Sequence, residues 1–157
     1  MRLFIATPVT CPIYYKIKQD LMPFVSGKWV EGYNLHITHL FIGEDDPKKY
    51  QKLKLDIPKE KIKVDSLGMF GKKILYLKPN SQHINSINNQ LSKILNIDTD
   101  FKPHITICRV KEIKDKEELE AKINSYKFDF EVDFELNLYQ SILTNKGPIY
   151  KKIYKYS

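Results

Sequence analysis

The stretch Phe101-Lys102-Pro103-His104-Ile105-Thr106-Ile107-Cys108-Arg109-Val110 decides the fold, together with a shorter copy of its centre at Leu35-His36-Ile37-Thr38. Both contain His-Ile-Thr inside an apolar, β-branched run, which predicts a strand. Side chains two residues apart in a strand lie on the same face, so each copy presents an imidazole beside a hydroxyl. Two such pairs facing each other across a cleft suit acid–base chemistry on an anion such as a phosphodiester.

Size and composition are those of one globular domain. The chain has 157 residues, which is enough to bury a core, and 42% of them are hydrophobic. No apolar run approaches the roughly 20 residues of a membrane span, and no signal peptide is expected. Two cysteines without metal-site spacing, Cys11 and Cys108, indicate a cytoplasmic setting with free thiols. The net charge of +7 favours polyanionic partners, although solubility or a biased genome also produces lysine-rich surfaces.

Apolar spacing predicts an α+β fold. Helices are expected at about residues 11–21, 46–53, 82–95 and 116–126. Strands are expected at 1–6, 29–30, 34–42, 61–70, 73–78, 103–110 and 149–156, and the alternation from Phe128 to Leu138 predicts one long strand that continues extended to 143. Because helix and His-x-Thr strand occur once in each half, we expect two pseudo-symmetric lobes. Each lobe is an antiparallel sheet with outer helices beside a central cleft, and residues 1–157 form one two-lobed domain.

The two motif histidines are the first candidates for a functional site. A single His-x-Thr is typical of a half-buried strand histidine, but two copies in a chain with four histidines favour a shared site. His39 is out of step with His36, so we interpret it as structural or surface, and His83 as a solvated residue at a helix start. No carboxylate or cysteine completes a metal site from His36, His39 and His104, so no metal is expected.

Other candidates have both a structural and a functional interpretation. Cys108 shares the parity of His104 and can line the same face, but a buried structural thiol is favoured. Arg109 is one place out of parity and is expected to reach the cleft from the strand end, where it clamps phosphate oxygens, or else to be a surface arginine. Phe41 and Tyr139 either stack on a nucleobase or pack in the core. Four lysines either form a basic rim or are ordinary solvated side chains: Lys28, Lys72, Lys102 and Lys111.

The chain resembles the two-histidine phosphoesterases, and within them the RNA 2′,3′-cyclic phosphodiesterase (LigT-like, or 2′-5′ RNA ligase) group. Four stretches that span the chain carry the resemblance: Met1-Arg2-Leu3-Phe4-Ile5-Ala6, Asn34 through Gly43, Phe101 through Lys111, and Leu138-Tyr139-Gln140-Ser141 through Gly147-Pro148-Ile149-Tyr150. The chain departs from the family at His39, where leucine is usual.

The resemblance implies a bilobal α+β fold, a metal-free site without cofactor, and opening of a terminal RNA 2′,3′-cyclic phosphate to a 2′-phosphate. His36 and His104 are then the catalytic pair. Thr38, Thr106 and Arg109 bind phosphate, and Phe41 contacts the nucleobase. We expect a cytoplasmic monomer, without membrane association, that acts in RNA processing on cyclic-phosphate ends such as those of tRNA fragments.

Several alternatives remain at this point. We expect His36 to act as the acid and His104 as the base, although the two motifs are nearly symmetric. The same site run backwards would join RNA ends through a 2′-5′ linkage, and hydrolysis of 2′-5′ linkages is a related activity. A non-catalytic RNA-end binder and a phosphoesterase for small cyclic nucleotides are the other interpretations.

Overall fold

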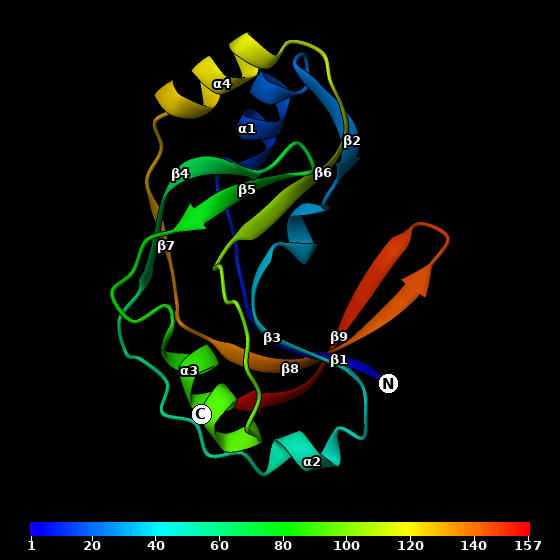
Figure 1. Cartoon of the computed structure of the whole chain (residues 1–157), viewed down its shortest axis with the longest axis vertical. Coiled ribbons are helices and arrows are strands. Elements are labelled where there is room, and N and C mark those ends of the chain that lie inside the picture. The colour runs from blue at the N-terminus through cyan, green and yellow to red at the C-terminus, as the bar shows by residue number, and fades with distance from the viewer.

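Two antiparallel sheets form the computed structural model, which describes residues 1–157 (Figure 1). The four-stranded sheet has the order β3-β1-β8-β9, and the five-stranded sheet has the order β2-β6-β5-β4-β7. The first consists of β1 (Arg2–Pro8), β3 (His36–Glu44), β8 (Leu136–Thr144) and β9 (Gly147–Tyr156). The second consists of β2 (Val25–Trp29), β4 (Ile62–Phe70), β5 (Ile74–Pro79), β6 (Ile105–Ile113) and β7 (Phe130–Val132). The predicted α+β class and the two antiparallel sheets are confirmed.

Helices cover the outer side of each sheet. In Figure 1, α1 (Tyr14–Leu21) and α4 (Lys116–Ser125) lie above the five-stranded sheet, and α2 (Lys48–Gln51) and α3 (Ser86–Leu95) lie below the four-stranded sheet. A short 3-10 helix, η1 (Gly32–Asn34), leads into β3. The helix α1 follows β1 in the chain but covers the other sheet, and its Tyr14 hydroxyl donates to the Val30 carbonyl at 2.5 Å. The chain therefore passes back and forth between the two sheets. No helix is long and apolar enough to cross a membrane.

One core joins the two sheets, and a smaller cluster lies apart from it. The main cluster holds 29 buried residues, which include Ile5 of β1, Leu77 of β5 and Ile107 of β6. The strands β3 and β6 are in contact, although they belong to different sheets. The small cluster consists of Phe4, Ala6 and Tyr139, with Tyr150 packed against it. The four-stranded sheet therefore has a core face and a second face that carries the small cluster.

Two strand predictions were wrong. The alternation from Phe128 to Leu138 does not mark one strand, because β7 ends at Val132 in the five-stranded sheet and β8 begins at Leu136 in the four-stranded sheet. The alternation persists because both strands bury one face. The short strand predicted at 29–30 is instead β2, which spans Val25–Trp29 and contains Gly27 in its interior. The predicted helices are all present but shorter, since α1 begins at Tyr14 and α3 at Ser86.

His39 is a buried structural histidine, which confirms one of the two interpretations made for it. Its side chain is 1% exposed and stacks on Phe134, with ring centroids 5.6 Å apart. Its Nε2 shares a hydrogen bond of 2.8 Å with the hydroxyl of Thr7, while Nδ1 has no partner. Burial lowers the pKa of His39 to about 3, because the charged ring would lose its hydration.

This lowered pKa predicts an acid-sensitive stability. An unfolded histidine has a pKa of about 6.5, so the stabilising contribution of His39 is complete above that pH and is lost as the pH falls towards 3. Between those values we expect the unfolding free energy of the wild type to fall by up to about 1.4 kcal/mol per pH unit more than that of His39→Leu. Urea titrations at several pH values measure both slopes. His83→Ala, at an exposed position, should follow the wild type; parallel slopes for the wild type and His39→Leu would contradict the assignment.

Candidate active site

Both motif histidines are held by the same kind of backbone hydrogen bond. Nδ1 of His36 lies 2.7 Å from the carbonyl oxygen of Asn34, and Nδ1 of His104 lies 2.7 Å from that of Lys102. A carbonyl oxygen only accepts, so Nδ1 donates the proton and the neutral ring has its free lone pair on Nε2. Each imidazole can therefore take a proton at Nε2, or give one there once protonated, without losing its anchor to the backbone.

The two imidazoles come from different sheets and lie close enough for their charges to interact. His36 begins β3, and His104 immediately precedes β6. Burial lowers the pKa of His36, and the charges of His104 and Arg109 lower it further, while the hydrogen bond to Asn34 acts in the opposite direction. The structure thus brings together the two histidines that the sequence singled out, and the charge of Arg109, another residue expected at the site, acts on His36.

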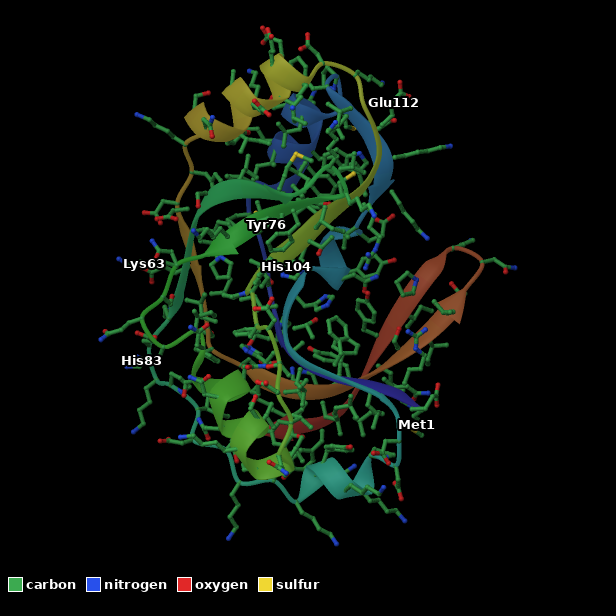
Figure 2. The ribbon with its side chains drawn as sticks, viewed as in Figure 1. Met1, Lys63, Tyr76, His83, His104 and Glu112 are labelled. Atoms are coloured by element: carbon green, nitrogen blue, oxygen red, sulfur yellow. The ribbon has the colours of Figure 1, made fainter.

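Aromatic rings fix the orientation of each imidazole. The ring of His36 lies 5.3 Å from that of Phe4 and meets Tyr150 edge to face at 5.0 Å. The ring of His104 meets Phe70 edge to face at 4.9 Å and Tyr76 at 5.8 Å. Figure 2 shows Tyr76 and His104 side by side at the centre of the molecule. These contacts restrict each ring to one orientation and remove water from one side of it.

A β-bulge in each motif strand sets which side chains join the site. In β3, Thr38 pairs with Ala6 and Leu40 with Ile5, so His39 is an extra residue. A bulge restarts the alternation, and Phe41 therefore lies on the face of His36 and Thr38, with an exposed fraction of 75%. Its ring centroid lies 6.4 Å from that of Phe4.

The bulge in β6 corrects the prediction for Arg109. Thr106 pairs with Tyr76 and Cys108 with Leu75, which leaves Ile107 as the extra residue. Both Ile107 and Cys108 are buried in the core, and Arg109 is exposed in the middle of β6. Arg109 therefore shares the face of Thr106 because of the bulge, and it does not reach the site from the strand end. Its charge acts on both His36 and Tyr150.

The two threonines complete the set. Thr38 and Thr106 are half-buried, each two residues after its histidine. Such hydroxyls can donate to an anionic oxygen. Together, two imidazoles, two hydroxyls and one guanidinium form a group that suits a phosphate whose bonds are to be broken by proton transfer.

The other candidate residues lie either in the core or on the surface. Cys108 is a buried core thiol, and burial raises its pKa to about 11. Tyr139 is buried and stacks on Phe4 at 5.3 Å, so it packs beneath the site instead of presenting a free stacking surface. His83 is exposed, and its Nδ1 lies 3.1 Å from a carboxylate oxygen of Glu60. All four lysines of the suggested rim are exposed: Lys28, Lys72, Lys102 and Lys111.

Sequence reasoning did not assign a role to Tyr150 or to Asn34. Tyr150 packs on His36, and burial raises its pKa, while the charge of Arg109 lowers it. Asn34 anchors His36 through its carbonyl, and its side-chain amide donates to the Pro148 carbonyl at 3.0 Å, which joins η1 to the β8–β9 hairpin. The signal for Asn34 was its place two residues before the motif, which Lys102 repeats.

Comparisons with known proteins identify the family of the chain. The profile described as LigT like Phosphoesterase matches residues 77–150. A Methanocaldococcus jannaschii protein named RNA 2′,3′-cyclic phosphodiesterase is 36% identical, and an Archaeoglobus fulgidus protein of the same name is 37% identical, each over 98% of both chains. The crystal structure of a Thermus thermophilus protein matches with a TM-score of 0.75 at 23% identity, over 99% of this chain and 97% of that one. The chain belongs to the LigT-like group of the two-histidine phosphoesterase family, and the resemblance seen in the sequence is confirmed.

The close approach of β2 to β6 beside Arg109 can be tested. A Cβ on Gly27 would overlap the carbonyl oxygen of Arg109. Gly27→Ala must therefore push β2 away from the bulged strand, and we expect it to lower the free energy of unfolding by about 1–3 kcal/mol, the usual cost of overpacking. Gly32→Ala is the matched control, because its Cβ would meet nothing nearer than Tyr14 Cδ2 at 3.6 Å. Equal urea midpoints for Gly27→Ala and the wild type would contradict the packing described.

Proposed function

We propose that the chain hydrolyses a terminal RNA 2′,3′-cyclic phosphate to a 2′-phosphate, without a metal ion or cofactor. The observation that carries the proposal is the pair of imidazoles from two sheets, each anchored at Nδ1 and each free to exchange a proton at Nε2. Its support from related proteins is the name RNA 2′,3′-cyclic phosphodiesterase, borne by the two archaeal relatives.

The proposed reaction is an in-line displacement at phosphorus. A neutral imidazole takes a proton from water, and the water oxygen forms a bond to phosphorus. The bond between phosphorus and O3′ breaks, and the second, protonated imidazole gives its proton to O3′. Thr38, Thr106 and Arg109 hold the nonbridging oxygens, where negative charge increases in the transition state, and Phe41 stacks on the terminal base.

The lowered pKa of His36 favours the reverse of the acid and base roles that the sequence led us to expect. A general base must be neutral before the reaction, and a general acid must be protonated. Burial and the neighbouring charges keep His36 neutral at neutral pH. We therefore propose His36 as the base and His104 as the acid.

The remaining proposals concern the location, oligomeric state and domain organisation of the chain. Both cysteines are free, and we propose a cytoplasmic enzyme that acts as a monomer on RNA ends, including those of tRNA fragments. We also propose that residues 1–157 act as one two-lobed domain, since the main core contains residues of both sheets.

The first experiment uses a short RNA that ends in a 2′,3′-cyclic phosphate, with EDTA present. We expect the wild type to release a 2′-phosphate, and His36→Ala and His104→Ala each to lose at least about 100-fold in turnover, the usual contribution of one general acid or base. His83→Ala should keep full activity. A 3′-phosphate product, inactivation by EDTA, or unchanged turnover in either motif variant would contradict the proposal. Tight binding without turnover would identify a non-catalytic RNA-end binder.

The same assay with sulfur in place of O3′ separates the two roles. A thiolate is a far better leaving group than an alkoxide, because a thiol has a pKa of only about 8.5, so its departure needs no general acid. We expect His104→Ala to recover most of its lost turnover on this substrate and His36→Ala to remain impaired. Recovery by His36→Ala alone would instead support His36 as the acid and His104 as the base, as first expected from the sequence.

A further inference from the structure

A second polar cluster lies on β8 and β9, beside the candidate active site. The carboxylate of Glu135 accepts a hydrogen bond of 2.6 Å from the side-chain amide of Asn137. The same carboxylate binds the ammonium groups of Lys152 at 3.3 Å and Lys155 at 3.7 Å. Because of the amide and the two lysines, the pKa of Glu135 is held below its usual value. One carboxylate therefore gathers two ammonium groups at one place on the surface.

Strand pairing places these lysines on the face that carries the phosphate-binding threonine. Thr38 of β3 pairs with Ala6 of β1, Ala6 pairs with Asn137 of β8, and Asn137 pairs with Lys155 of β9. Residues directly opposite each other in a sheet lie on the same face. Thr38 and Asn137 are two strand spacings apart, which is about 10 Å.

The neighbouring row of residues leads to the second lysine. Phe41 pairs with Phe4, Phe4 pairs with Tyr139, and Tyr139 pairs with Lys152. The rings of Phe4 and Tyr139 stack at 5.3 Å, so this row is an apolar and aromatic strip between Phe41 and Lys152. Phe4 and Tyr139 are buried in this row, so a nucleic-acid strand that leaves the reacting phosphate across this face passes over the two rings without stacking on them and then meets the lysines.

Charge and burial distinguish the cluster from scattered surface lysines. Residues 135–157 contain four lysines, and Glu135 is their one acidic residue. The side chains of Lys152 and Lys155 are 49% and 63% exposed, while Asn137, which holds their shared carboxylate, is fully buried with its Oδ1 unpartnered. With two ammonium groups on one carboxylate, the cluster keeps a net positive charge.

We propose that Lys152 and Lys155 form a subsite for the phosphates of the RNA strand on the 5′ side of the reacting end. The inference rests on the proposed function, which places the terminal cyclic phosphate at the two histidines. Lysines act as point charges on backbone phosphates and do not read bases. The chain therefore prefers an oligonucleotide over a cyclic mononucleotide, and it does so without regard to the sequence upstream of the end.

The experiment compares two double variants that remove the same charge. Lys152→Gln with Lys155→Gln removes the subsite. Lys146→Gln with Lys151→Gln is the matched control, because Lys146 lies in the hairpin turn and Lys151 pairs with Gln140, one position out of step with Tyr139. Each protein is assayed on a cyclic mononucleotide and on a short RNA with a 2′,3′-cyclic phosphate. Affinity for the same RNA ending in a 2′-phosphate is measured by fluorescence anisotropy over a range of salt concentrations.

We expect the subsite variant to lose about tenfold in kcat/KM on the RNA at low salt and to keep its activity on the mononucleotide. The slope of log affinity against log salt should become shallower by about 1.4, since each phosphate contact on a single strand contributes about 0.7. The control should keep the wild-type kcat/KM ratio of RNA to mononucleotide.

Two results would overturn the inference: equal losses on RNA and mononucleotide, or equal losses of RNA affinity in both double variants. In another outcome, the wild type turns over neither substrate, and only the subsite variant binds RNA more weakly than the wild type. That result would support the subsite and contradict the proposed reaction. The two proposals therefore fail separately.

Discussion

Strand β3 has one extra residue, His39, between the partners of Ile5 and Ala6, and strand β6 has one, Ile107, between the partners of Leu75 and Tyr76. The site depends on this matched pair of bulges. In a regular strand, the third residue after each threonine would lie on the opposite face from it. Because each strand buries two successive residues at its bulge, Phe41 and Arg109 return to the face of the histidines. Phe41 and Arg109 thus occupy equivalent positions in the two strands, one with an aromatic ring and the other with a cation.

The environment of the imidazoles explains how two similar residues can take different roles. Both are anchored at Nδ1 and both contact aromatic rings, so geometry alone does not distinguish them. His36 differs in that burial lowers its pKa and the nearby charges of His104 and Arg109 lower it further. Desolvation and a neighbouring cation both oppose protonation. The proposed phosphodiester substrate would bring negative charge to the same place and offset the repulsion.

Much of this organisation is visible in the sequence, and the rest depends on strand pairing. The repeated His-Ile-Thr predicts the paired strands and the two imidazoles, because side-chain alternation is a local property. The place of Arg109 was misjudged because a bulge is a property of two strands, and Thr106 and Cys108 show it only when paired with β5. The sequence did not predict the break between β7 and β8 for a similar reason. Phe130 and Phe134 continue one alternation, although the chain changes sheets between them. Tyr150 packs on His36 across a long sequence separation, where the β8–β9 hairpin is joined to Asn34.

The most direct test of the account is an NMR titration of the four histidines, with and without a nucleoside 2′-phosphate. We expect the pKa of His36 to lie below the ordinary value of about 6.5 in the free protein and to rise when the ligand binds, and we expect the ligand to shift the ring resonances of both His36 and His104. The ligand should leave the ring resonances of His83 unchanged, and His39 should remain neutral throughout the neutral range. A ligand that shifts the ring resonances of only one motif histidine, or of neither, would contradict a single site built from both strands.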